Sequence, residues 1–382
     1  MSTIKSVYLQ HLNGTTPNAT MDTNGNFTVG GTVSGASSNM FRNRIINGDM
    51  RIDQRSNGSS VSVSTDARAA ASDRFVGAAV GGGVFTLQRV ADAPTGFSYS
   101  LKATVTTNST PASSGHYYQI NQRVEGYNVA DLGWGASGSK TATLSFWVKS
   151  SITGTYGISF LREAASSYRS YVSSYTINAA NTWEYKTITV SGDTVFRTTD
   201  EYTNGSGVAI SFQLGLSSLY QTSTLNQWQT GVYTSPTTMT QWISTNGATF
   251  NLTGVQFEVG TSATPFEFRS YGQELALCQR YFYKSNPNTI QGNGGFGGGM
   301  YTTTNASMSG YWPVTMRATP TVSRGSSNDS FYISNINGAA SGTLQNLYPS
   351  VNGMWTEVNS LQTSTVGMPI FYNGQLSVSA EL

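Results

Sequence analysis

The side chains that most often carry acid–base or metal chemistry are scarce in this sequence. There are only two histidines, His11 and His116, and neither has Asp, Cys or Ser neighbours in a pattern typical of a catalytic triad or a metal site. The single cysteine, Cys278, excludes an intrachain disulfide framework and a cysteine-based zinc site. We therefore expect no catalytic residues, no metal centre and no cofactor.

Carboxylates are the remaining groups that could break a bond. Cleavage of a glycosidic bond needs two carboxyl groups roughly 5 to 10 Å apart. Of the 19 acidic residues, Glu184 and Glu258 fall on expected strands, whereas Asp200-Glu201 and Asp329 fall in expected turns. A catalytic pair stays open on this basis, but solvated or hydrogen-bonded side chains are the simpler interpretation, and we expect a protein that is not an enzyme.

Aromatic side chains offer binding chemistry instead. The chain holds 21 Tyr and 7 Trp, and these side chains combine a flat apolar face with a polar tip, which suits contact with sugar rings. Three of them in polar or turn-like stretches, Tyr301, Tyr348 and Trp355, are candidate contacts for a glycan or a receptor. Burial in a core is the competing interpretation, because most aromatic residues of a β-sandwich are core residues.

The composition favours strands as the elements that position these residues. Charged residues make up 10% of the chain, against roughly 25% in an average soluble domain, and 41 residues are Gly. Neutral polar and aromatic residues suit strands, whereas helical surfaces usually carry Glu, Lys and Ala. The net charge of +2, with no long basic run, argues against nucleic-acid binding. The sequence contains no run of about 18 apolar residues, so we expect no membrane-spanning segment. The N-terminal residues lack the apolar segment of a secretory signal, so we expect synthesis in a cytoplasm.

Residues 1–40 have the composition of an arm. Gly, Thr, Asn and Ser dominate, so the segment cannot bury enough apolar surface to order itself. The Asn24-Gly25 dipeptide is a hairpin signal. Apolar residues alternate on both sides of it and are the candidates for anchoring the arm to a partner: Val7, Leu9, Phe27 and Val29. We expect a small β-element that orders against a partner; a disordered tail is the alternative.

Residues 41–270 have the pattern of one jelly-roll β-sandwich. Apolar residues alternate with polar ones in 142–148, 208–216 and 250–259, which is typical of strands with one buried face. In the last of these, the alternation changes phase at Gly254, as it does at a β-bulge. Repeated strands with turn-rich gaps favour a sandwich or jelly roll over a fold of alternating strands and helices.

The C-terminal part is predicted as a helix followed by a second β domain. Apolar spacing predicts a short linking helix over 271–284, with Ser270 as its N-cap and Asn286-Pro287 as its end. The glycine-rich stretch 292–300 lacks the Lys and Ser/Thr of a phosphate-binding loop, so we interpret it as a flexible loop. Residues 285–382 are expected to form a small C-terminal β-sandwich.

Several stretches together resemble the tail-fibre and fibre-like proteins of tailed bacteriophages. FRNRIINGDMRIDQR (41–55) is similar to the entry segment of that family, and LTGVQFEVGTSATPFEFRSYGQELALCQRYFYK (252–284) is similar to the strand, turn and helix that close the same domain. SFWVKSS (145–151) matches its central strand, which resembles carbohydrate-binding jelly rolls. Further matches lie near the C-terminus: Pro313-Val314, Met316-Arg317, Thr319-Pro320 and Ala380-Glu381-Leu382.

The resemblance implies a role on a virus particle. We expect a structural fibre protein on the outer surface of the virion that joins another tail or capsid protein through residues 1–40. As a homotrimer it would bind a host-surface glycan or protein. Some related jelly rolls hold a structural calcium ion, but no Asp-rich loop here demands one. Two alternatives stay open: a capsid decoration or head-fibre protein, and a polysaccharide depolymerase, although the long repeats usual in depolymerases do not occur here.

Overall fold

The computed structural model describes two separate units of the chain. Contacts divide it into Met1–Arg42 and Asn43–Leu382. The described residues are 8–9, 19–21, 27–29, 41–64, 68–111, 115–164, 167–195, 202–285, 296–324, 329–333, 339–359, 361, 363–372 and 374–382. Across these ranges the regular elements are nearly all strands, with a single α-helix and a few 3-10 turns, which confirms the all-β class.

The N-terminal unit contains a small antiparallel sheet. Its strands are β1 (Tyr8–Leu9), β2 (Ala19–Met21) and β3 (Phe27–Val29), in the order β1-β2-β3. Three of the four candidate anchoring residues, Leu9, Phe27 and Val29, therefore belong to strands. Val7 and the Asn24-Gly25 signal lie outside the described residues.

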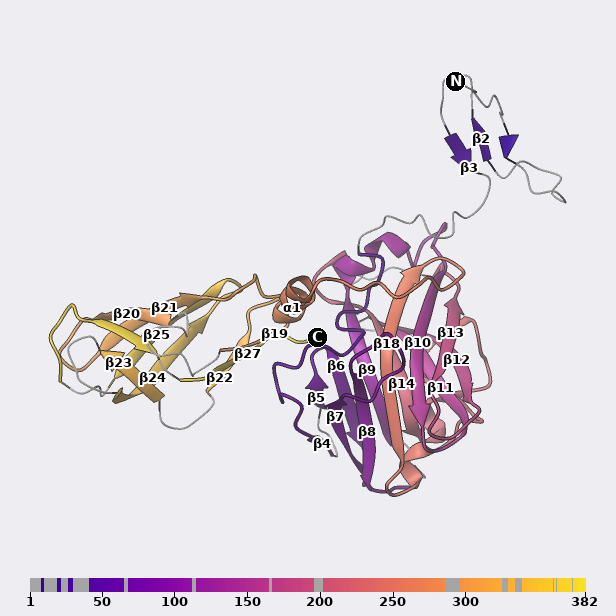
Figure 1. Ribbon diagram of the computed structural model, residues 1–382, viewed down its shortest axis with the longest axis horizontal. Helices are drawn as coiled ribbons and strands as arrows, with labels where there is room; N and C mark the ends of the chain where they lie inside the picture. Colours follow the sequence, from indigo (N-terminus) through magenta and orange to yellow (C-terminus); the bar gives the residue numbers. More distant parts are fainter. Residues whose placement is uncertain are drawn as a thin grey trace. The chain divides into compact units, whose positions relative to one another are not determined.

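Two antiparallel sheets form the predicted sandwich (Figure 1). The first has the strand order β13 (Glu184–Val190), β10 (Ala142–Ser150), β18 (Thr249–Val259), β8 (Ser100–Thr107), β7 (Val84–Val90) and β4 (Val61–Val63). The second has the order β16 (Trp228–Thr230), β12 (Ser167–Ile177), β11 (Gly154–Ala164), β14 (Ser206–Leu216), β9 (Tyr117–Glu125), β6 (Phe75–Val80) and β5 (Arg68–Ser72). The connections contain a two-strand parallel pair, β15 (Gln221–Thr222) with β17 (Ser235–Pro236), and 3-10 turns at Gly126–Asn128, Ala130–Leu132, Ser218–Tyr220 and Trp242–Ser244.

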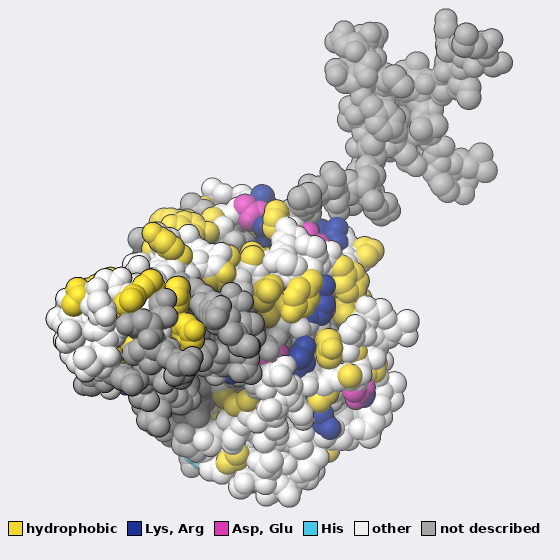
Figure 2. All heavy atoms as spheres, turned by 60° about the vertical axis from the view of Figure 1, so that its left-hand side comes forward, with side chains coloured by type: hydrophobic (Ala, Val, Ile, Leu, Met, Phe, Trp, Pro, Cys, Tyr) yellow, Lys and Arg dark blue, Asp and Glu magenta, His cyan; other side chains and the backbone are white. Residues whose placement is uncertain are grey.

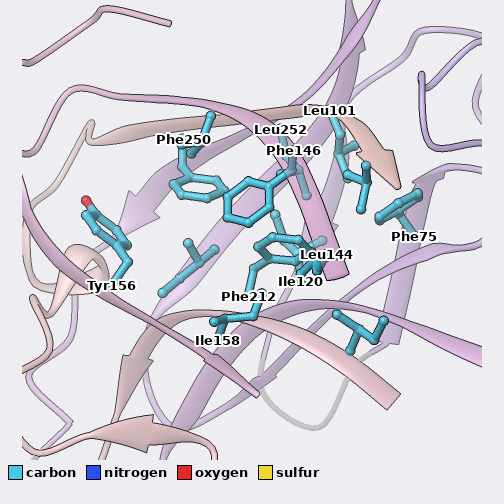
Figure 3. Packing of buried hydrophobic residues seen from close by; sticks show 14 of the residues in the cluster. Phe75, Leu101, Ile120, Leu144, Phe146, Tyr156, Ile158, Phe212, Phe250 and Leu252 are labelled. Carbon is cyan, nitrogen blue, oxygen red and sulfur yellow. The ribbon is translucent and has the colours of Figure 1, made fainter. Parts of the chain in front are cut away.

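The alternating apolar residues of both sheets meet in one core. Figure 3 shows Phe146 pointing toward Phe212 and Phe250 between the sheets. The rings of Phe146 and Phe212 meet edge to face, with centroids 5.0 Å apart. Each fully buried side chain of this size stabilises the fold by roughly 1.5 to 3 kcal/mol. The period-two pattern therefore identifies the strands and also which face of each is buried.

Gly254 interrupts β18 as predicted. The register between β10 and β18 shifts between Ser145 and Trp147, opposite Gly254, which has a φ of +60°. This confirms the β-bulge. A Cβ atom at Gly254 would lie 2.8 Å from the ring of Phe97 and 3.0 Å from that of Trp147. Glycine is required here both for the backbone conformation and for the approach of the two rings.

The helix is shorter than the sequence predicts. Helix α1 (Tyr271–Gln279) begins with the expected cap, because the Ser270 hydroxyl accepts a hydrogen bond from the Gln273 amide at 3.4 Å. It ends before 284, and the predicted end, Asn286-Pro287, lies outside the described residues. The last residues of the predicted helix form β19 (Phe282–Lys284), which pairs with β27 (Leu376–Ser379) beside β22 (Thr321–Arg324). Pairing with a strand almost 100 residues away outweighs the local helical spacing.

The C-terminal strands close into a barrel, where we expected a small sandwich. Its strands follow the order β20 (Phe296–Met300), β21 (Ala306–Tyr311), β25 (Gly353–Asn359), β24 (Ala339–Pro349), β23 (Asp329–Ile333) and β26 (Pro369–Tyr372). Strand β26 pairs with both β23 and β20, so the ring has no free edge. The prediction of a flexible glycine-rich loop is also wrong for residues 296–300, because these residues form β20. At Gly298 a Cβ atom would lie 1.8 Å from the Ser307 carbonyl oxygen.

Candidate functional site: an aromatic stripe on the barrel

Two of the three candidate contact residues lie side by side. Tyr348 on β24 and Trp355 on β25 are directly opposite each other, and their ring centroids are 5.0 Å apart. Both are well exposed, at 55% and 42%. Tyr301 is also exposed but lies in the turn after β20, and it makes no ring contact with the other two among the described residues. The pairing of strands therefore brings together two of the three.

A third aromatic residue, Tyr311, extends this pair. It ends β21 and is 85% exposed. Ser309 lies opposite Trp355, so Tyr311, two residues further on, faces the same side of the barrel. Its own partner is Gly353, which has no side chain to separate Tyr311 from Trp355. We call Tyr311, Trp355 and Tyr348 the aromatic stripe; it crosses β21, β25 and β24.

Polar groups border the aromatic stripe at one end. Glu357 lies two residues beyond Trp355 on the same face of β25, and its carboxylate accepts a hydrogen bond of 2.8 Å from the Asn346 side chain. Asn346 has a φ of +40° and sits where the pairing of β24 with β25 shifts register. Such an irregularity redirects a side chain. Flat rings beside a carboxylate and an amide can stack on a sugar ring and hydrogen-bond its hydroxyls.

Glu184 and Glu258, the two catalytic candidates on strands, lie too far apart to act as a pair. Glu184 lies opposite Val148 and Glu258 opposite Thr143, five residues apart along β10, which corresponds to about 17 Å. Glu184 accepts hydrogen bonds from Lys186 and from the amides of Asn178 and Ala179. Burial tends to raise its pKa, but these bonds outweigh burial and lower the pKa to about 2.

Glu258 is buried and hydrogen-bonded, and several of the other polar candidates lie outside the described residues. The Glu258 carboxylate accepts 2.8 Å hydrogen bonds from the Gln256 side chain and the Thr264 amide. His11, Asp200-Glu201 and the side chain of Asp329 lie outside the described part of the chain. Within that part, no three His, Cys, Asp or Glu side chains gather closely enough to hold a metal ion. None of its helices has the length and apolar character needed to cross a bilayer.

The residues that carry the family resemblance form a buried polar network. The Asn43 side chain donates to the Val255 carbonyl at 3.0 Å, and the Asn47 amide donates to the carboxylate of Glu274. Arg269 donates to the Ile45 carbonyl at 3.1 Å and also pairs with Glu274. These contacts join the entry segment to β18 and α1, so these residues help to specify the fold.

The chain is similar to several solved structures. No protein-family model and no curated protein matches the chain. The enzymatically active domain of tailspike protein 4 of bacteriophage CBA120 is 16% identical with a TM-score of 0.29, covering 57% of this chain and 22% of that one. The family 11 carbohydrate-binding module of a cellulosomal cellulase of Clostridium thermocellum is 10% identical with a TM-score of 0.27, covering 55% and 99%. The N-terminal cellulose-binding domain of a Cellulomonas fimi β-1,4-glucanase is 14% identical with a TM-score of 0.26, covering 54% and 91%.

Proposed function

We propose that this protein is a non-enzymatic fibre protein on the outer surface of a phage virion, and that it binds a host-surface glycan through the aromatic stripe. The observation that carries the binding function is the exposed pair Tyr348 and Trp355, with Tyr311 beside it. Contiguous exposed apolar surface on a soluble protein often marks a site of interaction. The polar groups at its border, Glu357 and Asn346, favour a ligand rich in hydroxyl groups.

The virion role rests on the resemblance of 41–55 and 252–284 to phage fibre proteins. In this proposal residues 1–40 attach the protein to another virion component and three copies associate. Figure 2 shows few charged side chains on the face turned to the viewer, so charge does little to oppose association between copies. Three copies would also multiply a weak glycan site into useful avidity.

The binding function is tested on an array of purified bacterial capsular and O-antigen polysaccharides. Trp355→Ala and Tyr348→Ala should each weaken binding to the polysaccharide that the wild type selects by at least about tenfold, as expected for an aromatic hot spot. Tyr127→Ala is the matched control, because Tyr127 is 61% exposed but lies on the sandwich. Wild-type binding by both barrel variants would refute the assignment of the stripe.

The virion role is tested by deletion of residues 1–40. The shortened protein should remain a folded oligomer in analytical ultracentrifugation but fail to join particles during assembly. Normal incorporation of the shortened protein would refute the anchoring role of the arm.

A further inference from the structure

A groove on the sandwich has the chemistry of a second binding site. It lies between the outer face of the second sheet and the segment 217–234 that follows β14, and it has a volume of about 180 Å³. Six of its lining residues matter for the argument, and we call the site that they form the polar groove: Tyr117, Gln119, Asn121, Ser211, Tyr220 and Thr234. It shares no strand with the aromatic stripe.

The floor of the polar groove is a block of neutral polar side chains from adjacent strands. Asn121 on β9 lies opposite Ser211 on β14, and Gln119 lies opposite Gln213. Asn121 and Ser211 are only 4% and 5% exposed. Polar side chains on the outer face of a sheet are usually exposed to solvent. Here the 217–234 segment covers Asn121 and Ser211, and this covering is a specific feature of the fold.

These buried groups have unused hydrogen-bonding capacity. Gln213 donates to the Gln119 side chain at 3.1 Å, but its own Oε1 is buried and accepts no hydrogen bond from the described residues. The Thr234 hydroxyl is in the same situation. The side chains of Asn121 and Ser211 likewise make no hydrogen bond within the described ranges. Buried polar groups are almost always satisfied by protein, solvent or ligand, so this floor is suited to a ligand that both donates and accepts.

The aromatic rings, the low charge and the small volume of the polar groove indicate which class of ligand it could bind. The rings of Tyr117 and Tyr220 meet at one side, with centroids 6.3 Å apart, and offer flat apolar surface. The one charged lining residue, Arg123, donates to the carbonyl of Leu382 at 3.4 Å. The volume is below the roughly 300 to 1,000 Å³ of sites for drug-sized ligands. We propose that the polar groove binds one uncharged pyranose residue of a saccharide, held by hydrogen bonds to Asn121 and Ser211 and by contact with Tyr220.

The test uses the Trp355→Ala protein, so that the aromatic stripe does not contribute. Isothermal titration with methyl glycosides of neutral hexoses, 6-deoxyhexoses and N-acetylhexosamines should detect binding of at least one of them. The double change Asn121→Ala and Ser211→Ala should weaken that binding at least tenfold. Thr187→Ala is the control, since Thr187 is exposed on the outer face of the other sheet, and it should bind like the parent.

A second variant keeps the test decisive if the double variant unfolds. Tyr220→Ala changes a partly exposed wall residue of the connecting segment and should also weaken binding. Absence of binding by every glycoside, or equal binding by parent and groove variants, would overturn the inference. These outcomes differ from failure of the proposed function, which is judged by the effect of Trp355→Ala on polysaccharide binding.

Discussion

Arg280 donates two hydrogen bonds to the carboxylate of Glu125, 3.0 Å from its Nε and 2.6 Å from its Nη2. Glu125 is the last residue of β9 and is buried, whereas Arg280 directly follows α1. The Tyr281 hydroxyl donates to the same carboxylate at 2.5 Å. One carboxylate of the sandwich therefore holds the segment that leads from the helix into β19.

Glu125→Ala should destabilise the protein by about 3 kcal/mol, because it removes three hydrogen bonds and leaves Arg280 without its carboxylate partner. Urea unfolding followed by circular dichroism measures this change. Lys140→Ala is the control: Lys140 and Asp131 form an exposed pair at 3.9 Å, and its loss should cost less than about 1 kcal/mol. Equal effects of the two changes would contradict the structural role of Glu125.

Gly254→Ala should cost about 2 kcal/mol or more, because alanine is strained at a φ of +60° and its Cβ would press on Phe97 and Trp147. Gly58→Ala separates the two causes. Gly58 also has a positive φ, +81°, but a Cβ atom there would meet nothing within 4 Å. Thermal unfolding should show the larger loss at Gly254. The steric part of the explanation fails if the two losses are the same.

The stability of the protein should depend on pH through Asp73. Burial raises the pKa of this carboxyl from 3.8 to about 6, although hydrogen bonds from Gln54 oppose the rise. The folded state therefore binds the proton more tightly than the unfolded state, and this group's contribution to stability increases as pH falls from about 6 to about 4. The difference in pKa corresponds to about 3 kcal/mol.

Asp73→Asn should remove this increase when unfolding by urea is measured at pH 4, 5, 6 and 7. Asp92 provides a comparison of opposite sign, since a hydrogen bond from Lys149 lowers its pKa. Its contribution is present at neutral pH and is lost as pH falls. A pH profile for Asp73→Asn that follows the wild type would contradict the assignment to Asp73.

The sandwich could be predicted from the sequence because its signal is local. Alternation in 142–148, 208–216 and 250–259 depends on neighbours two residues apart, and the strands β10, β14 and β18 contain those stretches. The bulge at Gly254 was predicted for the same reason. The end of the helix was not, since Phe282 pairs with Ser379, and no pattern near Phe282 reveals that partner.

The binding surfaces depend on contacts that a linear pattern does not contain. Gln119 and Gln213 lie 94 residues apart in the chain but share a hydrogen bond in the polar groove. The sequence does not show Tyr311 as a neighbour of Trp355, because only the pairing of β21 with β25 brings the two residues to one face. Polar neighbours in the sequence predict that Tyr348 and Trp355 are exposed, but they do not predict that the two rings are adjacent.

The most direct test of the central claim measures binding and cleavage together. The polysaccharide that the array identifies is incubated with the purified full-length protein, and both the bound protein and newly formed reducing ends are quantified. We predict a stable complex without new reducing ends, and at least tenfold less complex with Trp355→Ala. Release of reducing ends, or an equal amount of complex with Trp355→Ala, would contradict a scaffold that binds glycan through the aromatic stripe.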